Sequence, residues 1–174
     1  RGLGDVYKRQ EGSSVGVHII RQNTKIEKSL KKVNEKLLLV EEYIDGTDYT
    51  VALMNGRPLG ILEIIPSESF YNYSAKYKDK RTLYRYPKKT NKNILNKIIS
   101  MAKKANNQLK ATGITRVDFR VNERKGEEGI YVLELNTQPG LTRSSLVPKM
   151  AKQAEISFEK LIDWIVKDAK IDKT

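Results

Sequence analysis

The chain has no cysteine and a single histidine, His18, among its 174 residues. The lack of cysteine excludes a disulfide framework, a thiolate nucleophile and a cysteine-based zinc site. One histidine cannot form a metal cluster, and we interpret His18, within the apolar run VGVHII, as structural. No apolar run approaches the roughly 18 residues that span a bilayer, and no signal peptide is recognisable. We therefore expect a cytoplasmic protein with no membrane partner.

Acidic residues are outnumbered by basic ones, 21 against 33, which gives a formal net charge of +12. Such basicity can indicate nucleic-acid binding. The lysines are spread along the chain, however, and in segments 28–36 and 96–104 they alternate with apolar residues at helical spacing, which places them on outward faces. We therefore expect a solvated basic surface and no nucleic-acid partner. A basic nucleic-acid-binding module remains the alternative outside enzyme chemistry.

Two predicted strands carry polar pairs spaced two residues apart. TRVDFRV (115–121) holds Arg116 and Asp118, and YVLELN (131–136) holds Glu134 and Asn136. Side chains at i and i+2 point to the same face of a strand. Two acids and an amide beside a guanidinium offer the oxygen ligands that Mg²⁺ prefers. The pattern predicts a site for Mg²⁺ and an anion, although a solvated sheet face would show the same alternation.

The residues before Glu134 bear on that alternative. Because side chains alternate along a strand, Ile130 and Val132 are predicted to lie on the same face as Glu134. The carboxylate would then follow a row of apolar side chains that is covered from solvent. A covered carboxylate needs a cation or a hydrogen-bond donor as its partner.

Three further segments have features of binding loops. EGSSVGV (11–17) has two glycines bracketing serines, which suits close approach to a phosphate. SESFYNYSAKYKDK (67–80) is a long polar loop with several aromatics. NTQPGLTRSS (136–145) is predicted to be a loop that leads into a helix over about 144–154, whose N-terminus would suit a carboxylate or phosphate.

These stretches, in this order and together with VEEYIDGTDYTVAL (40–53), resemble the D-alanine–D-alanine ligases of the ATP-grasp superfamily. The resemblance covers nearly everything from Glu11 to about Ala169. It implies ATP- and Mg²⁺-dependent ligation of two D-alanines through an acyl phosphate, for peptidoglycan precursor synthesis. It also implies a homodimer in the full-length enzyme. Another ATP-grasp carboxylate–amine ligase is the alternative within the same fold.

The resemblance also implies which residues hold ATP. Ser13 would, in addition, hydrogen-bond the tyrosine of the closing loop. The ATP phosphates would be held by the glycine–serine loop and a lysine: Gly12, Ser13, Ser14, Gly16 and Lys76. Adenine would be held by the hinge strand and an aromatic residue: Glu41, Glu42, Tyr43, Ile44 and Phe70. The ribose would be bound by Asp48.

The remaining implied roles concern catalysis. Arg116 would stabilise the tetrahedral intermediate, and the Gly140 N–H would hold a reacting carboxyl oxygen. Two Mg²⁺ ions, with Mn²⁺ as a substitute, would be bound by Asp118, Glu134 and Asn136. The second D-alanine carboxylate would be bound at Ser145 and Leu146. Tyr77 is the closing-loop tyrosine that accompanies amine rather than hydroxyl attack.

The implied fold is α+β, an ATP-grasp fold with part of the central lid subdomain and a C-terminal subdomain built on a mostly antiparallel sheet. Residues 1–10 match no family motif and resemble a translated adapter junction, so we expect them to be foreign. We assign 11–44 to the lid and 45–174 to the C-terminal catalytic subdomain, and expect the chain alone to be inactive.

The elements follow from spacing. The expected helices are 25–36, 91–111, 144–154 and 158–169, and the expected strands are 37–44, 49–54 and 59–65 besides the two with polar pairs. Asn55-Gly56 predicts a tight hairpin between the last two.

Overall fold

The computed structural model describes residues 5–8, 17–19, 38–66 and 81–169. They belong to two compact units, one of residues 1–45 and 65–83 and the other of residues 46–64 and 84–174. The sequence-based assignment of 1–10, 11–44 and 45–174 stays a prediction. The expected helix 25–36 lies outside the described residues.

A small antiparallel sheet belongs to the first unit. Strands β1 (Asp5–Lys8), β2 (His18–Ile19) and β3 (Leu38–Val40) lie in the order β2-β1-β3. The strand expected to reach Ile44 ends at Val40, and residues 41–45 have no regular secondary structure. β1 lies within the stretch expected to be foreign, but strand pairing does not reveal the origin of a segment, and that expectation stays a prediction.

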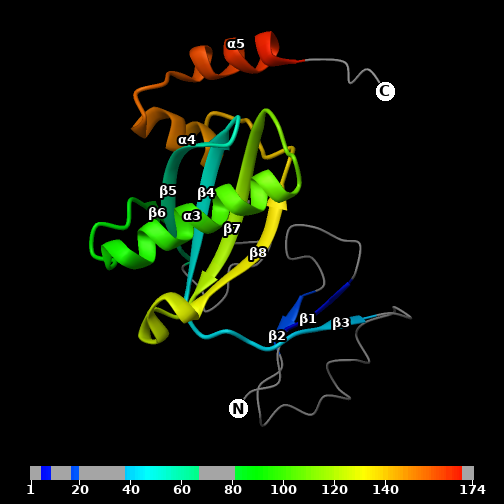
Figure 1. The fold of residues 1–174 in the computed structure, drawn as a ribbon, viewed down its shortest axis with the longest axis vertical. Helices are drawn as coiled ribbons and strands as arrows, with labels where there is room; N and C mark the ends of the chain where they lie inside the picture. The colour runs from blue at the N-terminus through cyan, green and yellow to red at the C-terminus, as the bar shows by residue number, and fades with distance from the viewer. Residues whose placement is uncertain (1–4, 9–16, 20–37, 67–80, 170–174) are drawn as a thin grey trace. The chain divides into compact units, whose positions relative to one another are not determined.

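A five-stranded sheet organises the second unit. Strands β4 (Thr47–Met54), β5 (Arg57–Ile65), β6 (Leu83–Arg85), β7 (Ile114–Val121) and β8 (Ile130–Asn136) lie in the order β6-β5-β4-β7-β8 (Figure 1). The pairings β4–β5, β4–β7 and β7–β8 are antiparallel. The mostly antiparallel α+β fold is therefore confirmed.

The turn between β4 and β5 is as tight as predicted. Asn55 and Gly56 have φ angles of 46° and 73°, the left-handed pair that a two-residue hairpin turn requires. Asparagine and glycine are the residues that tolerate this backbone best.

The long helix α3 (Lys92–Gln108) covers one face of this sheet (Figure 1). Asn91 caps it, because its side chain accepts a hydrogen bond from the Asn93 N–H at 2.8 Å. Its apolar stripe of Ile94, Ile98 and Ala102 is buried against alternate residues of the strands. The predicted helix is confirmed, with its C-terminal end three residues earlier.

Two shorter helices, α4 (Leu146–Gln153) and α5 (Phe158–Asp168), complete the unit. α4 buries Val147 and Met150 in a second core cluster, which includes Ala52 and Leu62 on the opposite side of the sheet from α3. Both predicted helices are confirmed within two residues at each end. Ser157 caps α5 as predicted, accepting from the Lys160 N–H at 3.2 Å.

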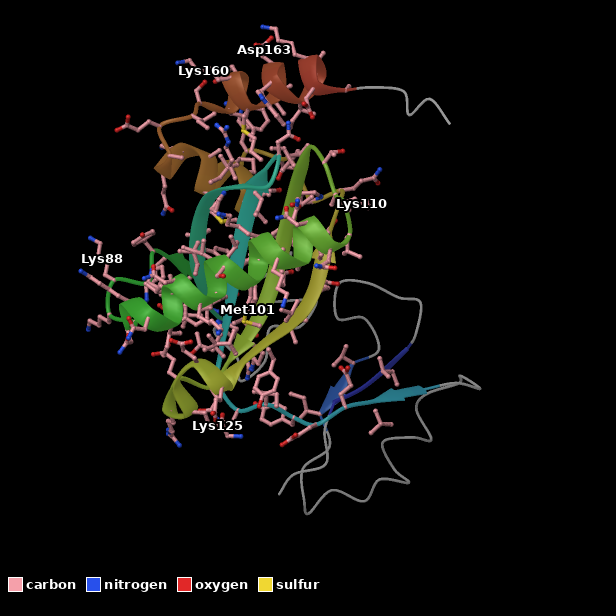
Figure 2. The ribbon with its side chains drawn as sticks, viewed as in Figure 1. Lys88, Met101, Lys110, Lys125, Lys160 and Asp163 are labelled. Atoms are coloured by element: carbon pink, nitrogen blue, oxygen red, sulfur yellow. The ribbon has the colours of Figure 1, made fainter. Side chains whose placement is uncertain are left out.

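The basic surface expected from the sequence is visible where lysines are labelled. Lys88, Lys110, Lys125 and Lys160 are exposed and their side chains point away from the ribbon (Figure 2). None of the helices in the described part of the chain is long and apolar enough to cross a membrane.

A buried tyrosine ties β4 to the segments flanking α3 and β7. The Tyr49 hydroxyl donates to Glu123 Oε1 at 2.5 Å, in the short helix η1 (Glu123–Gly129), and lies 2.8 Å from the Thr90 hydroxyl. Burial, followed by the hydrogen bond to Glu123, raises the pKa of Tyr49 well above its ordinary value. The protonated phenol is thus part of the folded state.

We predict that Tyr49→Phe lowers the free energy of unfolding by about 1–3 kcal/mol, because the buried phenol loses its part-buried hydrogen bond to the Glu123 carboxylate. The folded-state pKa is raised, so the stabilisation is complete below the unfolded pKa of about 10 and is lost as the pH rises above it. Urea titrations at pH 8 and above pH 10 measure this. Tyr131→Phe, whose hydroxyl has no hydrogen bond among the described residues, is the control. A difference between Tyr49→Phe and the unmodified chain that does not shrink above pH 10 contradicts the prediction.

Candidate functional site on the sheet face opposite helix α3

The polar pair on β7 lies on the sheet face opposite α3. Val117 and Phe119 belong to the core beneath α3. Arg116 and Asp118 alternate with them and therefore point to the other face. Across the sheet, Asp118 pairs in register with Thr50 of β4 and with Glu134 of β8. Two strands beside β7 thus contribute to one polar group.

A β-bulge decides how β8 contributes to it. The register shifts between Asp118 and Phe119, so that Glu134 lies opposite Asp118 but Val132 lies opposite Phe119. Leu133 is the extra residue, and it reverses the alternation along β8. The expectation that Ile130 and Val132 share the face of Glu134 is therefore wrong, because Ile130 belongs to the core under α3.

The expected covering of this carboxylate is also wrong. The Glu134 side chain is 58% exposed, and Val132 is 41% exposed. The bulge leaves Glu134 and Asn136 on the same face as Arg116 and Asp118, so the predicted convergence of the four side chains is present despite the wrong account of their neighbours.

Asp118 is the most tightly held member of the group. Arg116 donates from Nε to Oδ1 at 2.8 Å and from Nη2 to Oδ2 at 2.7 Å, in a two-pronged contact. The Thr50 hydroxyl donates to Oδ1 at 2.6 Å. Glu134 lies farther away, with Oε1 4.0 Å from Arg116 Nη2. The guanidinium therefore bridges the two acids.

The donor atoms of the group suit a hard cation. Asp118, Glu134 and Asn136 supply oxygen atoms only, from facing positions on two strands. Asn136 Oδ1 already accepts a hydrogen bond from the Gln138 N–H at 2.9 Å, which leaves it one further lone pair. Among the described residues no cluster of three or more acids or histidines could hold a metal. A metal here would therefore rely on the amide as its third ligand.

The loop after β8 forms a small hydroxyl cluster at the start of α4. Ser145 Oγ accepts from the Thr142 N–H at 3.1 Å and lies 2.7 Å from Thr142 Oγ1. It does not cap α4, although Ser145 is the N-cap residue and Leu146 the first helical residue. A side chain at Gly140 would approach Ser145 Oγ to 3.1 Å, so the absence of a β-carbon leaves room for the hydroxyl.

Asp48, expected to bind ribose, has a cationic neighbour. Its Oδ1 lies 3.0 Å from Arg120 Nη1, and both side chains are largely buried at 13% and 12% exposure. Neither Arg120 nor Thr50 is among the site residues predicted from the sequence. Arg120 continues the i, i+2 row of Arg116 and Asp118, a signal that could have found it, whereas a threonine in a strand carries no such signal.

Other expected site residues are placed less completely. Among Glu41–Ile44, the two glutamates are exposed, and Tyr43 and Ile44 are half-buried, in the first unit. The remainder lie outside the described residues, and their roles stay predictions: Gly12, Ser13, Ser14, Gly16, Phe70, Lys76 and Tyr77.

The antiparallel sheet, covered by α3 on one side and bearing α4 and an oxygen-rich polar group on the other, is the C-terminal part of an ATP-grasp fold. The family described as "D-ala D-ala ligase C-terminus" matches residues 6–167. The chain belongs to this family.

Individual relatives agree. D-alanine–D-alanine ligase of Pelagibacter ubique (strain HTCC1062) is 44% identical over 169 residues, 94% of this chain and 53% of the relative. In the crystal structure of D-alanine–D-alanine ligase from Bacillus anthracis, the sequence is 31% identical to this chain and the fold superposes with a TM-score of 0.77. The match covers 97% of this chain and 54% of that one. In a structure of D-alanine–D-alanine ligase from Bacillus anthracis complexed with ATP, the protein is 30% identical with a TM-score of 0.73, and the match covers 97% of this chain and 53% of that one. The chain spans about half the length of the curated relatives it matches.

We predict that Arg120→Met lowers the free energy of unfolding by about 1–3 kcal/mol, because it removes the cation that lies 3.0 Å from a largely buried carboxylate. Lys167→Met is the control, since the Lys167–Asp163 pair has a similar distance of 2.8 Å but exposed side chains, and exposed pairs contribute well under 1 kcal/mol. Chemical denaturation of both variants measures the free energy of unfolding. Equal losses in the two variants would contradict a stabilising role for the buried Arg120–Asp48 pair.

Proposed function

We propose that the protein to which this chain belongs joins two D-alanine molecules in an ATP- and Mg²⁺-dependent ligase reaction. The observation that carries the proposal is the group formed by Arg116, Asp118, Glu134 and Asn136 on one sheet face, in a chain that belongs to the ligase family. The names of the relatives and the ATP-bound structure of one of them support the substrate and the nucleotide.

The donor set fits Mg²⁺. Asp118 and Glu134 would supply carboxylate oxygens and Asn136 its amide oxygen. When bound, the metal would neutralise phosphate charge during transfer of the γ-phosphoryl group. Arg116 holds both Asp118 oxygens in the described structure, so the carboxylate stays oriented and charge-balanced until a cation competes with the guanidinium for it.

The chain's own residues have distinct tasks in this proposal. A carboxylate oxygen of the first D-alanine attacks the γ-phosphorus, which releases ADP and gives an acyl phosphate. The amine of the second D-alanine then attacks the acyl carbon. Arg116, placed beside both acids, would stabilise the negative charge that develops on the carbonyl oxygen. Phosphate leaves as the peptide bond is completed.

The loop after β8 would bind the second amino acid. The Gly140 N–H would hold the reacting oxygen, and the Ser145 hydroxyl, with the Leu146 N–H, would receive the carboxylate at the start of α4. The Thr142 contact fixes the Ser145 hydroxyl in position beforehand. Within the proposal the enzyme acts in the cytoplasm as a homodimer.

A hybrid enzyme tests the proposal. Residues 11–169 would replace the matching segment of the Pelagibacter ubique ligase, which is 44% identical over the shared length. We expect D-alanine-dependent ADP release from the hybrid and none above background from the 174-residue chain alone. D-alanyl-D-alanine is quantified by mass spectrometry. A folded hybrid that binds ATP but forms no dipeptide would overturn the substrate assignment.

In that hybrid we predict that Glu134→Gln lowers kcat at least a hundredfold and that Asn136→Ala raises the Mg²⁺ concentration needed for half-maximal rate. A carboxylate ligand is worth more to a hard cation than an amide. Glu128→Gln, an exposed acid in η1 outside the group, is the matched control and should leave both quantities unchanged. Full activity of Glu134→Gln would refute the ligand assignment.

A further inference from the structure

Thr50 is a fully buried polar residue with its hydroxyl aimed into the polar group on the sheet face. Its side chain is inaccessible to solvent, and its Oγ1 donates to Asp118 Oδ1 at 2.6 Å. It lies on β4, directly opposite Asp118 in the β4–β7 register. The backbone therefore fixes both ends of this hydrogen bond.

The donors around Asp118 are unequally shared between its two oxygens. Oδ1 accepts from Thr50 and from Arg116 Nε, whereas Oδ2 accepts only from Arg116 Nη2 among the described residues. Each carboxylate oxygen has about two lone-pair sites. Oδ1 is thus fully used, and Oδ2 retains the site through which the carboxylate can reach a cation.

The two donors to Asp118, Arg116 and Thr50, also differ in how freely their side chains can move. Arg116 has a long side chain whose guanidinium also lies 4.0 Å from Glu134, and in the proposed reaction it would also stabilise the charge on the reacting carbonyl oxygen. Thr50 has one side-chain torsion and no solvent-exposed surface, so it has no such freedom. When Arg116 releases Asp118, the threonine hydroxyl keeps Oδ1 in place.

We propose that Thr50 is a positioning residue, which holds Asp118 with Oδ2 directed to the divalent cation while Arg116 serves the reacting group. This inference rests on the proposed function. Residues that orient a ligating carboxylate typically change metal affinity 10–100-fold when removed.

The chain contains a matched control for the loss of such a bond. Thr115, on β7, is also fully buried, and its hydroxyl donates to Asn106 Oδ1 at the same 2.6 Å. Thr115→Val and Thr50→Val therefore remove equivalent buried hydrogen bonds, one outside the site and one inside it. Thr50→Ser keeps the hydroxyl and should restore its effect.

The first measurement needs no metal. In the 174-residue chain, the three-bond couplings from Cγ of Asp118 to its backbone N and C′ report its χ1 rotamer by NMR. We expect one rotamer in the unmodified chain and in Arg116→Ala, and averaged couplings in Arg116→Ala with Thr50→Val. A single unchanged rotamer in the double variant overturns the proposal.

The second measurement uses Mn²⁺ as the probe. Paramagnetic broadening of the Asp118, Glu134 and Asn136 amide signals gives an apparent affinity. We expect Thr50→Val to weaken it about tenfold or more, with Thr50→Ser and Thr115→Val near the unmodified value. Equal affinity in Thr50→Val overturns the inference. If the unmodified chain shows no broadening at these residues, the proposed metal site fails, and the Asp118 couplings decide the positioning role separately.

Discussion

The pairing of β7 with β8 contains one extra residue, Leu133, and the polar group depends on it. Without this bulge the alternation along β8 would place Glu134 on the same face as Ile130, which is buried beneath α3. The bulge instead allows one strand to contribute apolar side chains to the core at its start and polar side chains to the opposite face at its end. A seven-residue strand thereby serves both the packing of the unit and its chemistry.

The sequence was sufficient where local patterns decide the structure. The Asn55-Gly56 turn, the apolar stripe of α3 and the i, i+2 pair of Arg116 and Asp118 are each set by residues a few positions apart. The bulge could not be predicted, because VLEL reads as an ordinary alternating or buried strand and only the pairing with β7 reveals the inserted residue.

The same distinction explains the other differences. The Thr50 hydroxyl donates to the carboxylate of Asp118, which is 68 residues away along the chain, so no local pattern indicates the contact. Residues 41–44 were expected to extend β3, but propensity alone cannot set the end of a strand when its pairing partner is short. β1, which pairs with β3, has only four residues, and its register with β3 ends at Val40.

Arg116 and Asp118 occupy adjacent positions on the same face of β7 and carry opposite charges, so their charges balance within the strand. Arg116 neutralises Asp118 at hydrogen-bonding distance, so the sheet face does not accumulate negative charge before a ligand arrives. An oxygen-rich site without such an internal cation would repel itself and would fold less readily in the absence of metal. The arginine is thus compatible with both a stable empty site and the proposed electrostatic role during the reaction.

Asn55 has a wider influence than its place in a two-residue turn implies. Its backbone N–H donates to the Gly113 carbonyl at 2.8 Å, its side-chain oxygen accepts from the Gly113 N–H at 2.9 Å, and its side-chain nitrogen donates to Asp168 at 3.1 Å. The hairpin tip therefore joins the entry to β7 and the end of α5. Surface turns ordinarily accept inserted residues, but here an insertion would disrupt hydrogen bonds between three segments that are distant in sequence, so the length of this turn is constrained.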